Sequence, residues 1–158
     1  MKQLILLFVL FTGTLFGQDL KFVSATMQTI NSGAAPVSMT HYNIALKKEK
    51  PCKWSIDSVV SISSGQAVTY TIVACDDPNA SSPRYTALKT FSKTDIGTYF
   101  IKFSVSKQHG SGRPNGPQNM KVDTTNIDGG VVIYYRIKKK KKQMKVIEFE
   151  KLETVDAP

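Results

Sequence analysis

The sequence has no segment rich in alanine, leucine and glutamate, and it has few cysteines, histidines and tryptophans: two, two and one. Polar and β-branched residues dominate instead, so disorder, a coiled coil and a collagen-like repeat are all poor fits. A chain of 158 residues can build one globular domain with a real core, but it is too short for a two-domain enzyme with a cofactor fold. We therefore expect a single all-β domain.

The sequence also lacks the motifs of common catalytic and metal sites. It contains no Gly-x-Ser-x-Gly, no Cys-x-x-Cys, no His-x-x-x-His, no phosphate-binding glycine loop and no Asp-x-Asp-x-Asp calcium loop. His109 and Ser111 are close in sequence but lie in a loop rich in glycine and proline, which cannot hold catalytic geometry. We predict no enzymatic activity, no cofactor and no metal ion.

The first seventeen residues have the organisation of a targeting segment. Lys2 gives a positive start, residues 4–16 are mostly apolar, and Gly17 offers a small residue for cleavage. The apolar run is shorter than the roughly 20 residues needed to span a bilayer, and no later segment is long enough either. We expect residues 1–17 to be a cleaved secretory signal peptide and residues 18–158 to form one secreted or periplasmic domain without a transmembrane segment.

Export would place Cys52 and Cys75 in an oxidising compartment, where they could form one disulfide. A hairpin of residues 54–62 with 68–74 would bring both cysteines to its open end. Pairing the apolar faces of these strands leaves the two cysteines on opposite faces, unless a bulge changes the register. A disulfide and two half-buried free thiols therefore both remain open.

Alternation of apolar and polar residues recurs along the rest of the chain and predicts seven or eight strands. Turn residues separate them, which favours an antiparallel two-sheet sandwich over a closed barrel. The last two segments are expected to form a C-terminal hairpin. The segments are 22–30, 42–46, 54–62, 68–74, 85–91, 99–105, 131–137 and 144–152.

One short motif is similar to the Asp-x-Gly-x-Tyr turn of immunoglobulin domains. It comprises Asp95, Gly97 and Tyr99. Ile101 stands where an antibody domain carries its second cysteine, and Trp54 follows Cys52 by only two residues. The resemblance implies an immunoglobulin-like sandwich topology and no membership in the antibody superfamily.

A second set of features lies mainly at the two ends of the chain: Phe16-Gly17-Gln18, Ser24-Ala25-Thr26, Ile56 to Val59, Gly130 to Tyr134, Lys145 to Phe149 and the end at Pro158. In their order and spacing these features resemble a group of small uncharacterised secreted proteins of Bacteroidota bacteria. This resemblance implies export and a compact β domain, and it implies no activity.

Positive charge is concentrated near the C-terminus. The chain has 21 Lys and Arg against 12 Asp and Glu. Seven of these positive charges lie within ten residues that contain no acid. They are Arg136, Lys138, Lys139, Lys140, Lys141, Lys142 and Lys145. This run could serve as a soluble turn that protects a sheet edge, or it could contact an acidic polymer.

The two functional hypotheses belong to different classes. The first is an exported, non-enzymatic β-sandwich module that binds or structures an unknown ligand and contacts acidic envelope polymers or glycans through a lysine-rich hairpin tip. No aromatic residue interrupts the lysines, so we expect no base stacking and no sequence-specific binding of nucleic acid. The alternative is a small secreted hydrolase or hydrolase inhibitor that uses the loop of residues 109–119.

Overall fold

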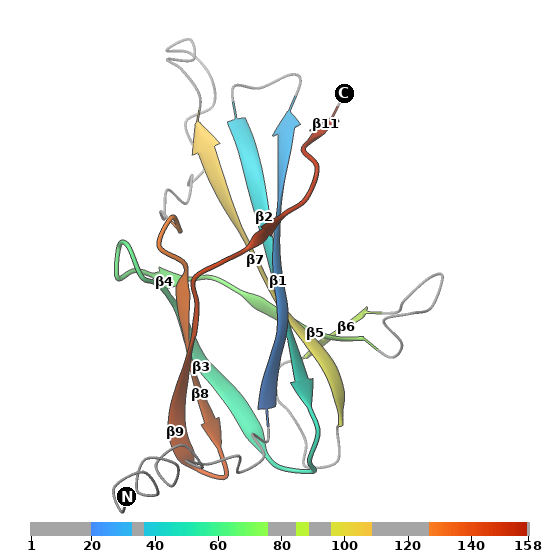
Figure 1. Ribbon diagram of the computed structural model, residues 1–158, viewed down its shortest axis with the longest axis vertical. Helices are drawn as coiled ribbons and strands as arrows, with labels where there is room; N and C mark the ends of the chain where they lie inside the picture. Colours follow the sequence, from blue (N-terminus) through green and yellow to red (C-terminus); the bar gives the residue numbers. More distant parts are fainter. Residues whose placement is uncertain (1–19, 33–36, 76–84, 89–95, 109–126, 158) are drawn as a thin grey trace, which may run out of the picture.

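The computed structural model describes residues 20–32, 37–75, 85–88, 96–108 and 127–157 (Figure 1). Within these ranges the chain forms strands and no helix, which confirms the predicted all-β class. The strands are β1 (Leu20–Ser32), β2 (Val37–Lys48), β3 (Trp54–Ser61), β4 (Ala67–Val68), β5 (Thr71–Cys75), β6 (Tyr85–Leu88), β7 (Gly97–Gln108), β8 (Val131–Ile137), β9 (Lys140–Val146), β10 (Glu150–Lys151) and β11 (Val155–Ala157).

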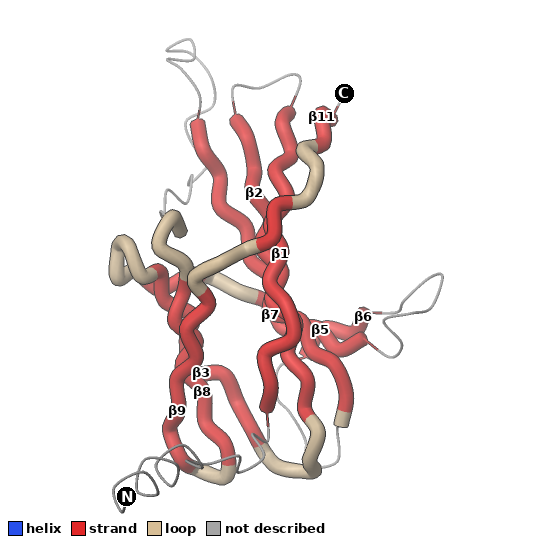
Figure 2. Tube along the Cα trace, viewed as in Figure 1, coloured by secondary structure: helices blue, strands red, loops and turns tan. Residues whose placement is uncertain are grey.

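The strands form two sheets that pack against each other as a sandwich, as expected (Figure 2). The large sheet has the order β10-β1-β2-β7-β5-β6, with β11 beside β1, and the small sheet has the order β4-β3-β8-β9. Every pair is antiparallel except those of β1 with β10 and β11, which are parallel. The long strands β1, β2 and β7 extend beyond the small sheet at one end (Figure 1).

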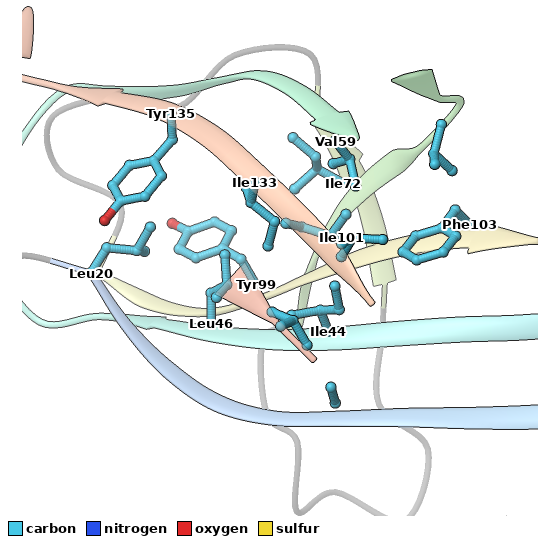
Figure 3. Packing of buried hydrophobic residues seen from close by; sticks show 14 of the residues in the cluster. Leu20, Ile44, Leu46, Val59, Ile72, Tyr99, Ile101, Phe103, Ile133 and Tyr135 are labelled. Atoms are coloured by element: carbon cyan, nitrogen blue, oxygen red, sulfur yellow. The ribbon is translucent and has the colours of Figure 1, made fainter. Parts of the chain in front are cut away.

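The core lies between the two sheets and is built by the period-two alternation of the strands. Ile44 on β2 pairs with Ile101 on β7, and both side chains are fully buried. Ile133 on β8 meets them from the small sheet (Figure 3). Trp54 is 3% exposed, and its ring contacts Tyr99 edge to face at 5.4 Å between centroids. A single tryptophan on an apolar strand face usually anchors a core, and Trp54 does so here.

The expected hairpin of residues 54–62 with 68–74, in which the alternation would pair Val60 with Val68, is wrong: only two residue pairs form here, and they are in another register. Val59 pairs with Val68 and Val60 with Ala67, but the chain then crosses to the large sheet. There β5 lies between β7 and β6, so its backbone is paired on both sides. The crossing is fixed by Tyr70, whose hydroxyl donates a 3.2 Å hydrogen bond to the carbonyl of Ile56.

The predicted C-terminal hairpin exists, but it is tighter than expected and does not end the chain. Lys138 and Lys139 have φ values of +50° and +70°, which is the signature of a two-residue turn, and Lys140 already pairs with Ile137. Most of the lysine run therefore belongs to a strand rather than to a tip. After Val146 the chain leaves the small sheet and adds β10 and β11 to the edge of the large one.

The immunoglobulin-like topology is not confirmed. Immunoglobulin constant domains have sheets of four and three strands in a Greek-key order. Here the sheets have seven and four strands, and the large sheet carries two parallel pairings at one edge. Tyr99 is buried and packs on Trp54, whereas Asp95 of the same motif lies outside the described residues.

Gly130 provides a test of the packing between the small sheet and the C-terminal crossing. Its φ is +85°, and a Cβ atom there would overlap the backbone of Val146 and Ile147. Gly65 has a similar φ of +69° but has open space around it. Gly130→Ala should lower the free energy of unfolding by about 3 kcal/mol or more, and Gly65→Ala by about 1 kcal/mol. Urea unfolding measures both, and equal losses would contradict this explanation.

Alkaline pH should destabilise the fold through its buried phenols. Burial raises the pKa of Tyr135 above its ordinary value near 10. The unfolded chain then loses this proton first, so the stabilisation is complete below about pH 10 and is lost as the pH rises through the folded-state pKa. Tyr135→Phe should show a smaller fall in unfolding free energy above pH 10 than the parent. Tyr134→Phe, at an exposed position of the same strand, is the control and should follow the parent.

Candidate functional site

The predicted basic residues lie along one edge of the small sheet. We call Lys138, Lys139, Lys140, Lys141, Lys142 and Lys145 the lysine edge. The first two form the turn, and the others lie on β9, which among the described strands pairs with β8 alone. All six side chains are exposed. Lys141 and Lys145 lie on the outer face of the sheet, and Lys140 and Lys142 lie on the core side, at its open margin.

The fold places one more lysine, Lys53, beside this edge, and it pairs the charge of Arg136 with a carboxylate. The backbone N–H of Lys138 donates a 3.1 Å hydrogen bond to the carbonyl of Lys53, which brings a further exposed lysine beside the turn. Arg136 instead forms a 2.8 Å ion pair with Asp57, at the bulge of β3. The sequence could not reveal either contact, because each joins residues about 80 positions apart.

An aromatic side chain also lies beside the lysine edge, where the sequence indicated none. Tyr134 on β8 pairs with Gln143 of β9 and is 40% exposed. The alternation of the two strands places it on the same outer face as Lys141 and Lys145. Cross-strand pairing makes these residues neighbours, so a linear reading of β9 misses the ring.

Of the two alternatives left open for the cysteines, the structure shows the free thiols: Cys52 and Cys75 are both buried and are not joined by a disulfide. Cys52 belongs to the core cluster between the sheets. On β5, Ile72 and Ala74 pack on that cluster, so the alternating Cys75 faces the other side of the large sheet. The two thiols thus lie on opposite sides of the large sheet, although the hairpin whose register suggested such a separation does not form.

A polar groove of about 490 Å³ lies over the face of the large sheet that points away from the core. Because Tyr42, Ile44, Ile101 and Phe103 contribute to the core, the residues that alternate with them face this groove. Two rows of paired positions line it. They are Thr26, Asn43, Lys102 and Thr71 in one row, and Gln28, His41 and Ser104 in the next.

One side-chain contact and one unsatisfied polar atom lie among the residues that line the groove. The His41 Nδ1 atom lies 2.7 Å from the Ser104 Oγ atom. The Oδ1 atom of Asn43 is buried and has no hydrogen-bond partner. A buried polar atom without a hydrogen-bond partner lowers the free energy of unfolding by about 1–3 kcal/mol. The groove therefore holds a polar acceptor that the folded chain does not satisfy.

The His41–Ser104 pair does not form a catalytic triad with the residues that line the groove. A serine nucleophile requires a third group that orients the histidine and donors for the oxyanion, and the lining residues include no carboxylate. The two residues lie opposite each other on paired strands, whose backbone N–H groups serve the sheet. The sequence does not indicate that these two side chains meet, because Ser104 is 63 positions from His41. This arrangement suits binding.

Several sequence-based candidates lie outside the described residues. They are the targeting segment 1–17 and the loop 109–119 with His109 and Ser111. In the ranges that are described, no helix has the length and apolar character needed to cross a membrane. In the same ranges, no three His, Cys, Asp or Glu side chains gather as a metal site.

The open edge of β9 leads to a prediction about self-association. Charged residues on an edge strand prevent it from pairing with another chain. Lys142→Val should therefore raise the average mass in solution as the protein concentration increases, as measured by light scattering. Lys47→Val makes the same change on β2, which is paired on both sides, and should leave the mass at the parent's value. Equal behaviour of both variants would contradict a protective role.

Comparisons with known proteins give no family to which the chain could be assigned. No protein-family model matches it, and no curated protein sequence matches it significantly.

Proposed function

We propose that this protein is an exported, non-enzymatic β-sandwich module that binds an anionic polysaccharide along the lysine edge. The observation that carries the proposal is the run of six exposed lysines in residues 138–145, with no acidic side chain among them. The resemblance to secreted bacterial proteins and the signal-like residues 1–17 support export, where acidic envelope polymers are present.

The spacing of the lysines favours a polymer over a small ion. Lys140 and Lys142 lie on one face of β9 about 7 Å apart, with Lys141 between them on the other face, and these spacings are shorter than the screening length of about 8–10 Å at 0.1–0.15 M salt. Their fields therefore overlap, and Lys145, about 14 Å from Lys141 along the strand, extends the row of positive charges to about 17 Å. A polymer that carries regularly spaced carboxylates, sulfates or phosphates can contact several lysines at once.

The surroundings of the strip favour a polysaccharide over a nucleic acid. Binding of single strands depends on several aromatic side chains that stack on successive bases. Beside the lysine edge the described residues offer one such ring, Tyr134, on the outer face. The alternative hydrolase or inhibitor would use residues 109–119, which lie outside the described part of the chain.

The test compares two variants with the same loss of charge. The edge variant changes Lys140, Lys141, Lys142 and Lys145 to Gln. The control changes four other exposed lysines, Lys47, Lys50, Lys107 and Lys151, to Gln. Retention on an immobilised sulfated or uronate polysaccharide is measured as a function of salt, with duplex DNA of known length in parallel.

The parent and the control should be retained at low salt, and the edge variant should elute early. The slope of log affinity against log salt should be less negative for the edge variant by about 3–4, since each lysine that displaces a counterion contributes about 0.9 on duplex DNA. Equal retention of the two variants would show that net charge alone causes binding, and would refute the proposal. Retention on DNA but not on polysaccharide would refute the proposed class of partner.

A further inference from the structure

The outer face of the small sheet, which points away from the core, carries side chains that take no part in the core. The large sheet covers the other face, and no described strand packs on this one (Figure 1). On β8 the residues that alternate with the buried Ile133 and Tyr135 point outward. They are Val132, Tyr134 and Arg136, and their pairing partners on β3 and β9 lie on the same face.

Tyr134 lies in the middle of this face. Its strand is paired on both sides, and the residue stands opposite Ser58 of β3 and Gln143 of β9. The ring is exposed, and the half-buried Val132 continues its apolar surface along β8. The centre of the outer face is therefore apolar, and a hydroxyl and an amide lie on its two sides.

Two lysines of the lysine edge share this face with the ring. Lys141 and Lys145 lie two residues to either side of the residue that pairs with Tyr134, so both are its diagonal neighbours. Diagonal neighbours are about 7–8 Å apart, a distance that long side chains can span. Lys140 and Lys142 alternate with them and point to the core side. The lysines of β9 are therefore not equivalent, because only two of them flank the ring.

The charge of the outer face is positive along β9 and neutral along β3. Arg136 also lies on this face, but its Nε atom is 2.8 Å from the Asp57 carboxylate, so the two charges offset each other. Asp57 is the only acidic residue in the four strands of the small sheet. This distribution favours an anionic ligand over β8 and β9.

An acidic sugar matches this arrangement. One face of a pyranose ring presents C–H groups with a small positive charge, and the face of an aromatic ring is negative. A sugar ring can therefore stack on Tyr134, while its hydroxyl groups form hydrogen bonds with Ser58 and Gln143. Acid groups on this sugar and on its neighbours in the polymer then lie close to Lys141 and Lys145. A polyanion without rings would gain from the lysines alone.

We propose that the acidic polysaccharide of the proposed function, on which this assignment rests, is bound on the outer face of the small sheet. A sugar ring stacks on Tyr134, and Lys141 and Lys145 hold the acid groups. The polymer follows the direction of β8 and β9, because the two lysines lie before and after the ring along the strand. Tyr134 is thus the residue that distinguishes a polysaccharide from other polyanions.

The first experiment compares two variants with the same loss of charge from the same strand. The outer variant changes Lys141 and Lys145 to Gln, and the core-side variant changes Lys140 and Lys142 to Gln. Retention on the immobilised sulfated or uronate polysaccharide is measured as a function of salt. The slope of log affinity against log salt should become less negative by about 1–2 in the outer variant and by less than about 0.5 in the core-side variant.

The second experiment removes the ring without changing the charge. Tyr134→Ala should weaken binding to the polysaccharide about five- to tenfold and leave the salt slope unchanged, because the lost contact is not ionic. Tyr134→Phe keeps the ring and should bind like the parent. Poly-L-glutamate, a polyanion without sugar rings, should bind Tyr134→Ala and the parent equally. Urea unfolding establishes that the variant is folded, and Tyr134→Leu replaces it if it is not.

Three results would overturn this assignment: equal effects of the outer and core-side variants, parent-like binding of Tyr134→Ala to the polysaccharide, or equal weakening of its binding to poly-L-glutamate. Each of them leaves the proposed function in place. The proposed function fails on a different result, when the change of all four β9 lysines lowers retention no more than the change of the four control lysines.

Discussion

The structure depends on the alternation of one long strand, β2, that is paired on both sides along most of its length. Because β1 and β7 fix its backbone, each side chain has only one face available. Ile44 and Leu46 point into the core and are fully buried, whereas His41 and Asn43 point into the polar groove. A shift of one residue in register would exchange these sets, so the hydrophobic core and the groove are positioned by the same constraint.

Two of the four crossings between the sheets, both from the small sheet to the large one, complete this arrangement. The first leads from β4 to β5, and it places Thr71 in the groove while Ile72 enters the core. The second leaves β9 at Val146, passes Gly130 and brings Leu152 to the margin of the groove. The small sheet is thereby left with β9 as an open edge, and the lysines on it remain in solvent. The positions of the groove and of the lysine edge thus result from where the chain changes sheets.

Much of the fold could be predicted from particular patterns of residues. The alternation around Tyr42, Ile44 and Leu46 indicated a strand with one buried face, and the single tryptophan indicated a core position. Val23 shows the limit of such patterns: its alternation with Ala25 and Met27 would place it on the buried face, but a bulge between Phe22 and Ser24 leaves it 53% exposed. A bulge depends on the partner strand, and no local pattern announces it.

The sequence by itself determined the all-β class, most of the core residues and the exposure of the lysine run, because alternation and charge act over a few neighbouring residues. Only the tertiary structure decided which strands pair, that Cys52 and Cys75 lie on opposite faces, and that His41 meets Ser104. A strand with this alternation can pair with any other strand of the same period. The choice of partner therefore depends on which pairing buries apolar faces that lie far apart in the sequence. The groove was invisible in the sequence for this reason, since its residues come from strands up to 126 positions apart, from Thr26 to Leu152.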